Sequence, residues 1–484
     1  MGVVIAIDAG TTGVRSRVVR ASGPSELSSY REFTQFFPRP GWVEHDAEEI
    51  WQAVLVTLQE VIGQLSEPIS AIGITNQRET VVAWSRKSGA PYGSAIVWQD
   101  RRTADRCEQL TNHLTTVRQQ TGLVLDPYFS GTKFEWLIRN RELKVDDDLC
   151  LGTIDAWLIF KLSGHKSFVT DVTNASRTML FNINKMCWSE ELCELLNVPI
   201  KNLPTVLPSS SRFGLTVKHG ALPDSIPISG VAGDQQAALF GQACFTTGAT
   251  KNTYGTGSFV LMNVGTKCPE PQNGILTTVA WQIESQKPVY ALEGAIFVTG
   301  AAIQWLRDGL NIIDHAREIG PLAQSVADSG GVVLVPAFAG LGSPWWDPYA
   351  RGSIFGITRG TTRAHIARAT IESIVFQTRD VVESMSAASG VEIKDLRVDG
   401  GVAVVDFMLQ LQADHLNCTV LRPKQLETTA MGAAFLAGLC EKVWSSTDEI
   451  SAAWQLDQKF EPKSVALGYE AWQTAIQRSM NWIN

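Results

Sequence analysis

The sequence lacks the patterns that mark several common classes of protein. None of its eight cysteines forms a CxxC pair, and no histidine spacing beside them suggests a zinc site. No apolar run approaches the length of a membrane span, and the apolar start is one strand long, too short for a signal peptide. We therefore expect a cytoplasmic protein, without membrane insertion, whose thiols are free and buried.

The chain also has no excess of basic residues. The chain has 41 Lys and Arg against 49 Asp and Glu, a net charge of −8 at pH 7, which argues against nucleic acid as a partner. No GxxxxGK[ST] sequence occurs, so a Walker-type phosphate loop is excluded. The composition is 44% hydrophobic and 19% charged, as in globular proteins, and 484 residues favour two domains.

Strands and helices alternate along the chain, which predicts an α/β fold. Val3–Ile7 and Val14–Val19 are typical of a hairpin around a Gly/Thr turn, and Ala47–Ile62 has helical spacing after a plausible N-cap, Asp46. Further strands are predicted at Ile69–Ile74, Val81–Trp84, Ala95–Trp98, Ile226–Ala232 and Leu396–Val398, and further helices at Ala237–Gly241 and after Gly401.

The second half of the chain repeats the opening pattern. Lys251–Phe259 again predicts a strand, a Gly/Thr turn and a strand, which is weak evidence of duplication. The boundary is predicted between Gly241 and Thr250, so we expect domains at 1–245 and 246–484.

A turn suited to phosphate follows the first strand, in Asp8-Ala9-Gly10-Thr11-Thr12. Glycine lets the backbone approach a ligand, successive N–H groups in a turn form an anion site, and the hydroxyls add donors. The Asp8 carboxylate is the kind of oxygen ligand that Mg²⁺ prefers. The motif alone also fits an ordinary Asp-Gly turn.

Two further polar groups follow predicted strands. Asp234 in Gly233-Asp234-Gln235 lies where open α/β sheets bind ligands, and Asp can accept an alcohol proton in phosphoryl transfer. Arg78-Glu79 combines donors with acceptors that can bind two neighbouring hydroxyls of a polyol. The alternatives are a helix cap for Asp234 and a surface ion pair for Arg78 and Glu79.

Two longer segments resemble the signatures of the FGGY carbohydrate kinases. They are Tyr128-Phe-Ser130-Gly-Thr-Lys133-Phe134-Glu-Trp136-Leu137, and Gly352-Ser-Ile354-Phe-Gly356-Ile357 continued through His365-Ile366 to Ala369-Thr370-Ile371-Glu372. The resemblance implies an ATP-dependent kinase with two RNase H-like domains, of the actin, hexokinase and Hsp70 superfamily, and an active site in the cleft between them.

Within that family the chain is similar to the glycerol kinases from about Val3 to about Gly438. The segments that carry this similarity are Asn76-Gln77-Arg78-Glu79-Thr80, Asn174-Ala175-Ser176-Arg177-Thr178-Met179, Gly233-Asp234-Gln235-Gln236-Ala237-Ala238, Asn252-Thr253-Tyr254-Gly255-Thr256-Gly257 and Pro344-Trp345-Trp346-Asp347-Pro348-Tyr349-Ala350-Arg351. The similarity implies transfer of the ATP γ-phosphoryl group to glycerol, giving sn-glycerol 3-phosphate and ADP. We also expect a homo-oligomer, a dimer or a tetramer.

The resemblance also implies a set of site residues. Glycerol is expected to contact Arg78, Glu79, Trp98, Tyr128, Asp234, Gln235 and Phe259, with Asp234 as the catalytic base. ATP is expected to contact Thr11, Thr12, Gly13, Arg15, Thr256, Gly300, Gln304, Gly401 and the position held by Val405. Mg²⁺ is expected near Asp8 and Asp234. Glycerol would lie in the N-terminal domain, and ATP mainly against the C-terminal domain.

Two positions depart from the family pattern. Val405 stands where the family usually has Asn near adenine, so we expect no side-chain hydrogen bond to the base from this residue. Some bacterial members bind fructose 1,6-bisphosphate through a Gly-rich loop with an Arg. Here Gly220–Ser225 lacks the glycine cluster and has Ser225 at the Arg position, so we expect no such inhibition.

Three alternative functions remain open from the sequence. One is an FGGY kinase of a pentulose such as xylulose, although xylulose kinases typically carry Met-His where this chain has Arg78-Glu79. Another is an ATPase like Hsp70 or actin, which has no need of a polyol-matched Arg-Glu pair. The third is a family member that binds ligand without turnover.

Overall fold

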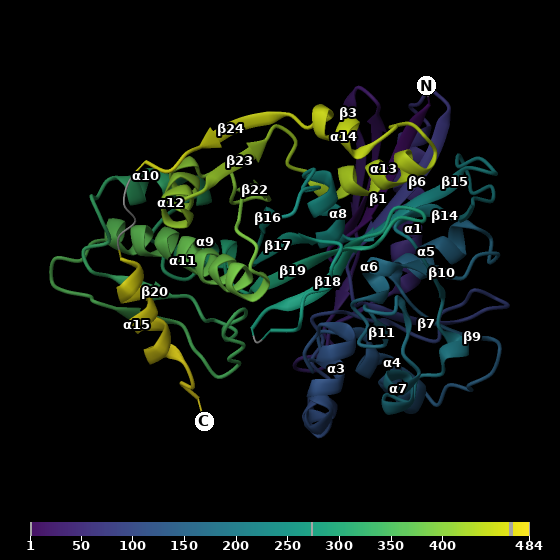
Figure 1. The fold of residues 1–484 in the computed structure, drawn as a ribbon, viewed down its shortest axis with the longest axis horizontal. Helices are drawn as coiled ribbons and strands as arrows, with labels where there is room; N and C mark the ends of the chain where they lie inside the picture. Colours follow the sequence, from purple (N-terminus) through teal and green to yellow (C-terminus); the bar gives the residue numbers. More distant parts are fainter. Residues whose placement is uncertain (1, 273, 464–467, 484) are drawn as a thin grey trace.

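Two large sheets organise the computed structural model, which describes residues 2–272, 274–463 and 468–483 (Figure 1). In the first sheet the strand order is β14-β15-β6-β1-β2-β3. Strands β1, β6 and β15 run parallel, while β2, β3 and β14 are antiparallel to their neighbours. The bounds are β1 (Val3–Ala9), β2 (Gly13–Arg20), β3 (Gly23–Glu32), β6 (Ile69–Asn76), β14 (Ser210–Leu215) and β15 (Pro227–Gly233).

The second sheet repeats this topology. Its order is β18-β19-β17-β16-β22-β23-β24, and β16, β22 and β23 are the parallel strands. The predicted α/β fold with two RNase H-like halves is therefore confirmed. The bounds are β16 (Ala249–Tyr254), β17 (Ser258–Gly265), β18 (Leu276–Trp281), β19 (Val289–Ile296), β22 (Asp395–Asp399), β23 (Thr419–Pro423) and β24 (Leu456–Phe460).

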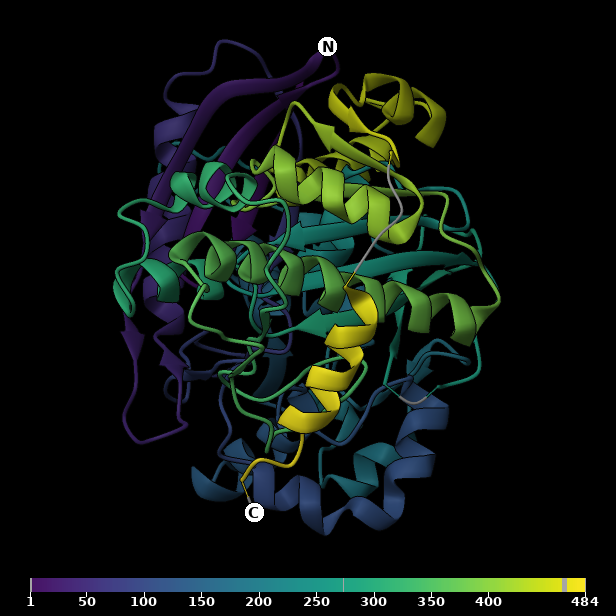
Figure 2. The same ribbon diagram turned by 90° about the vertical axis from the view of Figure 1, so that its left-hand side faces the viewer.

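Helices cover the faces of both sheets. The helices that follow or connect the parallel strands are α1 (Ala47–Ile62), α5 (Ile154–Leu162), α8 (Asp234–Gly241), α11 (Arg363–Ser389), α12 (Asp406–Leu416) and α13 (Thr428–Cys440). Figure 2 shows α11 as a long helix, with α15 (Tyr469–Ser479) beginning against its middle and running away from it. The Trp472 side chain of α15 donates a 2.8 Å hydrogen bond to Asp380 of α11. No helix of the described ranges is long and apolar enough to cross a membrane.

Smaller elements complete each half. Those of the first half are β4 (Gln35–Phe36), β5 (Glu44–His45), β7 (Val81–Ser85), β8 (Ala95–Ile96), α2 (Ala104–Gln109), α3 (Leu114–Thr121), α4 (Ser130–Asn140), β9 (Leu149–Thr153), β10 (Val169–Asp171), α6 (Val172–Ala175), β11 (Phe181–Asn182), β12 (Cys187–Trp188), α7 (Glu190–Leu195) and β13 (Thr205–Leu207). Those of the second half are α9 (Gly300–Asp308), α10 (Ile319–Gln324), β20 (Val333–Val335), β21 (Ser353–Phe355) and α14 (Thr447–Ala453).

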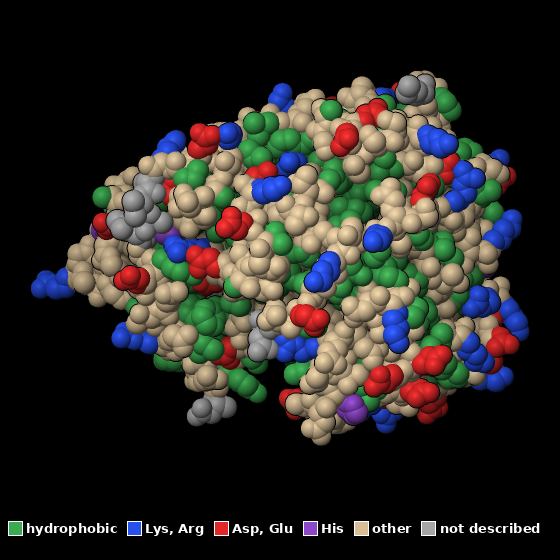
Figure 3. All heavy atoms as spheres, in the orientation of Figure 1, with side chains coloured by type: hydrophobic (Ala, Val, Ile, Leu, Met, Phe, Trp, Pro, Cys, Tyr) green, Lys and Arg blue, Asp and Glu red, His purple; other side chains and the backbone are tan. Residues whose placement is uncertain are grey.

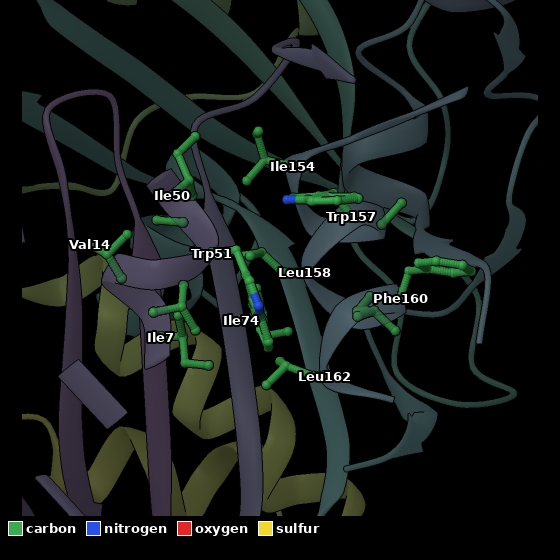
Figure 4. Packing of buried hydrophobic residues seen from close by; sticks show 14 of the residues in the cluster. Ile7, Val14, Ile50, Trp51, Ile74, Ile154, Trp157, Leu158, Phe160 and Leu162 are labelled. Carbon is green, nitrogen blue, oxygen red and sulfur yellow. The ribbon is translucent and has the colours of Figure 1, made fainter. Parts of the chain in front are cut away.

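The first sheet and helices α1 and α5 enclose one core, drawn in Figure 4. Ile7 and Ile74 from the sheet meet Ile50 of α1 and Trp157 of α5, all fully or almost fully buried. Helix α1 starts where the sequence predicts, because the Asp46 side chain accepts a 2.8 Å hydrogen bond from the Glu48 N–H.

Helices α8 and α13 lie between the two sheets and join the halves (Figure 1). Each follows the last parallel strand of its own sheet, yet α13 packs on β1, β6 and β15 of the first sheet. Glycines make this contact close. A Cβ atom at Gly432 of α13 would overlap the Ala237 carbonyl oxygen of α8, and one at Gly73 of β6 would overlap the Ala433 carbonyl of α13.

The register of the parallel strands places their ends side by side. Asn76 at the end of β6 lies opposite Ala9 of β1 and opposite Gly233 of β15. In the second sheet, Thr253 of β16 lies opposite Asp399 of β22. The turns that follow these strands therefore gather at one edge of each sheet, where open α/β sheets bind ligands.

Most predicted elements are confirmed, with small differences. Helix α8 begins at Asp234 rather than at Ala237, because a carboxylate at the first helical position is favourable at the positive end of the helix dipole. Strand β8 ends at Ile96, two residues earlier than predicted. Five of the eight free cysteines are buried, but Cys187 is exposed, which corrects the expectation that all thiols are buried.

We predict that Gly432→Ala destabilises the protein. Alanine normally gains up to ~1 kcal/mol over glycine inside a helix, but here its methyl group would overlap the α8 backbone, so we expect a net loss of ~1–3 kcal/mol in the free energy of unfolding. Urea denaturation measures this loss. Gly360→Ala is the matched control, because the new Cβ would lie 3.8 Å from Thr358 Oγ1 in an exposed turn. Equal effects of the two variants would contradict the close contact between α8 and α13.

Candidate active site

Arg78, which follows β6, lies at the centre of the site with only 2% of its side chain exposed. Its Nη1 and Nη2 atoms donate to the two carboxylate oxygens of Glu293, at 2.6 and 3.0 Å. Nη1 also donates to Gln236 at 3.1 Å, and Nη2 to the Tyr128 hydroxyl at 3.2 Å. The Nε atom lies 3.2 Å from Asp234 Oδ1. The alternative of a surface ion pair is thereby excluded.

A second buried arginine extends this network. Arg177 Nε donates to Glu79 at 2.6 Å, and its Nη2 donates to Glu293 at 3.0 Å. Glu293 thus bridges both guanidinium groups, and the four side chains Arg78, Glu293, Arg177 and Glu79 form a ring of alternating charge. We call these four residues the charge ring. Buried ions need such partners, because the solvation that they lose is large.

Local backbone geometry supports the ring. Glu79 has a φ of +60°, a left-handed conformation that is uncommon outside glycine, and such strained residues cluster at functional sites. Gly233 has room only for hydrogen, because a Cβ atom there would lie 2.6 Å from the side-chain carbons of Arg78.

The surrounding charges and burial shift the pKa values of Glu293, Glu79 and Asp234 in different directions. Burial would raise the pKa of Glu293, but Arg177 and Arg78 overcome it and lower the value to about 2. Burial raises the pKa of Glu79 despite the same two arginines. Burial also raises the pKa of Asp234, although Arg78 and Lys251 act in the opposite direction. Asp234 is consequently the more basic partner of Arg78, compared with Glu293, and is 31% exposed.

Lys251 of β16 lies near enough to Asp234 to act on its pKa. It is fully buried, and its Nζ donates to the side chains of Gln235 and, at 3.0 Å, Thr253. Burial lowers the pKa of Lys251 to about 8, although Asp399 and Asp234 act in the opposite direction. A residue of the second sheet therefore binds Gln235, the residue next to the carboxylate that follows β15 in the first sheet.

Aromatic side chains line the same region. The rings of Trp98 and Tyr128 meet edge to face with centroids 5.5 Å apart, and the Arg78 guanidinium lies 6.0 Å from the centre of the Phe259 ring. The Trp98 Nε1 atom donates a 3.0 Å hydrogen bond to Thr11 Oγ1. This bond links the surroundings of Arg78 to the turn after β1.

The turn after β1 is closed by a 3.0 Å hydrogen bond from the Gly10 N–H to the Gly13 carbonyl. Thr12, at the turn, is exposed, and Arg15 in β2 pairs with Glu427 at 3.3 Å. Burial, together with the nearby Asp234 and Glu427 carboxylates, raises the pKa of Asp8 to about 7, although Arg15 acts in the opposite direction.

A matching turn follows β16. The Gly300 N–H donates to the Gly255 carbonyl at 3.0 Å, and a Cβ atom at Gly300 would lie 2.6 Å from that oxygen. Thr256 is exposed in this turn, and its carbonyl accepts from the start of α9. Gly401 is exposed in the turn after β22, and a Cβ atom added there would meet no other atom within 4 Å.

Two residues predicted to bind the nucleotide lie on or next to helices α9 and α12. Gln304 is exposed on α9, one turn beyond Gly300. Val405 is the N-cap residue of α12 and makes no side-chain cap. The next residue, Asp406, pairs with Arg422 at 2.7 Å.

Models of protein families match both halves of the chain. The N-terminal domain of the FGGY family of carbohydrate kinases matches residues 3–241, and the C-terminal domain of the same family matches residues 250–440. The chain belongs to the FGGY family of carbohydrate kinases. Membership confirms the resemblance drawn from the sequence and an ATP-dependent phosphotransferase activity.

Relatives of this FGGY kinase include Glycerol kinase 2 of Thermotoga maritima, 52% identical over 100% of this chain and 99% of that protein. The glycerol kinase of Deinococcus radiodurans is 50% identical over 99% and 98% of the two chains. Among solved structures, Plasmodium falciparum glycerol kinase with ADP has a TM-score of 0.94 and 36% identity, covering 99% and 98%. Lactobacillus acidophilus xylulose kinase, with a TM-score of 0.88 over 99% and 97%, is 21% identical and shares the fold.

The sequence located many, but not all, of the residues that this FGGY kinase brings together. Arg78, Glu79, Tyr128 and Asp234 share one network, as described above. Glu293, Arg177 and Lys251 belong to the same network but were not predicted. For Glu293 a signal existed, since a single carboxylate stands in the otherwise uncharged strand Val289–Ile296.

Lys251 leads to a prediction about stability and pH. Its pKa is about 8 in the folded state against 10.5 unperturbed, so the unfolded chain binds more protons between these values and the free energy of unfolding should rise with pH across them. The difference of 2.5 units corresponds to ~3 kcal/mol. Lys251→Met should remove this rise in denaturation curves measured at a series of pH values from neutral upward. The other low-pKa lysine, Lys133, is present in both proteins, so parallel profiles would contradict the burial effect at Lys251.

Proposed function

We propose that this FGGY kinase transfers the γ-phosphoryl group of ATP to a terminal hydroxyl of glycerol, giving sn-glycerol 3-phosphate and ADP. One observation carries the proposal. The parallel strands β1, β6 and β15 end opposite one another, so the Arg78–Asp234 pair and the Gly/Thr turn after β1 lie at the same edge of the first sheet. Relatives named glycerol kinase, about half identical over nearly the whole chain, support the same substrate.

The polyol would bind between Arg78, Glu79 and Asp234. Guanidinium and carboxylate groups side by side can bind neighbouring hydroxyls, one as donor and the other as acceptor. Tyr128 would contribute its hydroxyl and Gln235 its amide, while the faces of Trp98 and Phe259 would cover the carbon atoms. Asp234 would accept the proton of the attacking hydroxyl, because burial raises its pKa and so strengthens it as a base.

ATP would bind across the two turns. Thr11, Thr12, Gly13 and Arg15 would contact phosphates from the first half, and Thr256, Gly300, Gln304 and Gly401 would hold the rest of the nucleotide. Open space at Gly401 supports close approach of a ligand to the backbone. Because phosphoryl transfer has a loose transition state, positioning by these residues and exclusion of water would supply most of the catalysis.

Mg²⁺ fits the residues present at Asp8 and Asp234. The described ranges contain no group of three or more His, Cys, Asp or Glu arranged to hold a metal ion alone. Mg²⁺ in kinases needs only one or two carboxylates, with water and substrate phosphates as the other ligands. A cation between these carboxylates would offset the repulsion that helps to raise the pKa of Asp8. When bound, Mg²⁺ would neutralise phosphate charge.

Three further features are part of the proposal. We infer a domain boundary near residue 245, because the first sheet ends at β15 and the second begins at β16. We also expect a homo-oligomer and a cytoplasmic location. Figure 3 shows acidic and basic side chains mixed over one face, which favours small-molecule substrates over nucleic acid.

The central experiment measures ATP turnover with and without glycerol. We expect turnover to require glycerol, with the pentulose xylulose a poor substitute. Asp234→Asn should lower kcat by at least ~10²-fold while glycerol still binds, because the amide keeps a hydrogen bond but cannot accept the proton. Calorimetry measures that binding.

Asp448→Asn is the control for this substitution. Asp448 also lies at a helix start, in α14, but its side chain is exposed and it is not one of the predicted site residues. An ATP hydrolysis rate that is the same with and without polyol would favour an ATPase, and faster turnover with xylulose than with glycerol would favour a pentulose kinase. A near-normal kcat for Asp234→Asn would reject Asp234 as the base.

Val405 generates a prediction about the nucleotide. An amide from Val405→Asn could reach the base edge, so we expect the ATP KM to fall several-fold, since a neutral hydrogen bond is worth ~0.5–1.5 kcal/mol. The ITP KM should fall less. Asp406→Ala should change the ATP KM by less than ~2-fold, because Asp406 pairs with Arg422 and an exposed carboxylate contributes little.

Val405→Thr is the matched control for a second effect of the asparagine. Position 405 is the N-cap of α12, where either Asn or Thr would add a helix cap worth ~0.5–2 kcal/mol. Both variants should therefore unfold at higher urea concentration. An equal fall in the ATP KM for Val405→Thr would mean that helix stability, and not contact with the base, causes the fall.

A further inference from the structure

Glu293 belongs to neither the motifs of the sequence nor the predicted site residues, yet it makes the shortest hydrogen bond of Arg78. It lies in β19 of the second sheet, opposite Leu261 of β17, and is fully buried. A fully buried carboxylate is costly unless it is paired, and both oxygens of Glu293 are paired with guanidinium groups. It is therefore not placed to meet a substrate from solvent.

The donors of Arg78 divide into an inner and an outer set. All of its guanidinium nitrogens have partners, at Glu293, Gln236, Tyr128 and Asp234. Glu293 and Gln236 are completely buried, whereas Tyr128 and Asp234 are partly exposed. Only the outer partners can exchange their hydrogen bonds for bonds to an incoming hydroxyl.

We propose that Glu293 is a positioning residue, which holds the inner edge of the Arg78 guanidinium so that its outer edge faces the polyol hydroxyls. This inference rests on the proposed function of the site. A bidentate carboxylate suits the task, because two parallel hydrogen bonds fix both the plane and the rotation of the guanidinium. A single hydrogen bond would leave the group free to turn.

Charge supports the same role. In the charge ring, two arginines face two glutamates, so loss of the Glu293 charge leaves two guanidinium groups with one carboxylate between them. Arg78 would then be drawn toward Glu79, which already lies 3.7 Å from its Nε atom, and away from the outer position. Glu293 acts through Arg78 and does not touch the substrate.

The test is a double-mutant cycle on Arg78 and Glu293 in the full-length protein, with glycerol and ATP as the probes. Glu293→Gln should raise the glycerol KM roughly 10- to 100-fold, the effect of losing hydrogen bonds to a charged group, while kcat changes less. ATP affinity of the free enzyme, measured by calorimetry, should stay within ~2-fold. In the Arg78→Ala background, Glu293→Gln should raise the glycerol KM little further, because the arginine through which Glu293 acts is already absent.

Two further variants separate positioning from general stability. Glu293→Asp keeps the charge but is one methylene shorter, so its glycerol KM should lie between those of the wild type and Glu293→Gln. If Glu293→Gln does not fold, the cycle uses Glu293→Asp. Asp380→Asn is the control, since this buried carboxylate of α11 accepts hydrogen bonds from Tyr469 and Trp472 of α15 and not from the charge ring, and its loss should leave the glycerol KM unchanged.

The outcomes separate this inference from the proposed function. Additive penalties in the cycle, or an ATP affinity that falls with that for glycerol, would overturn the role of Glu293 while wild-type glycerol turnover stands. A wild type that does not phosphorylate glycerol would overturn the proposed function. Non-additive penalties confined to glycerol, with partial rescue by Glu293→Asp, would establish the positioning role.

Discussion

Two arginines buried away from water impose the constraint on which the rest of the site depends. A guanidinium that has lost its solvation must be surrounded by fixed acceptors, because no water can replace a missing one. Glu293 accepts from both arginines and Glu79 accepts from Arg177, whereas Arg177 Nη1 has no hydrogen-bond partner among the described residues. The two carboxylates come from opposite halves of the chain. The site can exist only when both sheets are in place.

How much of the site can be predicted depends on how local its signals are. Asp8, Arg78 and Asp234 lie at or just after strand ends, and strands are recognised from short apolar runs, so their common edge follows from the α/β pattern. Glu293 lies inside a strand, 215 residues from Arg78, and Arg177 is 98 residues from Glu79. No local spacing encodes such pairs, and only the tertiary packing brings them together.

The fold was predictable to a similar degree and for the same reason. Hairpins, α1 and the parallel strands follow from period and capping, which are local. The packing of α13 on the first sheet does not, because no pattern in the segment Thr428–Cys440 identifies the element that it contacts. Gly432 and the alanines permit a close contact with α8 but do not specify one. Small residues on a helix indicate that another element packs closely against it, and only the structure shows which element that is.

These two non-local features have a joint consequence. The α8–α13 contact is too close to open without loss of packing, and it includes Ala237, about one turn after Asp234, the first residue of α8. Glu293 meanwhile ties the residue after β6 to β19. Arg78 is thus tied to the second sheet through Glu293, while Asp234 belongs to the helix pair. The 3.2 Å contact between Arg78 Nε and Asp234 Oδ1 therefore joins a group held by the second sheet to a group held by the helix pair.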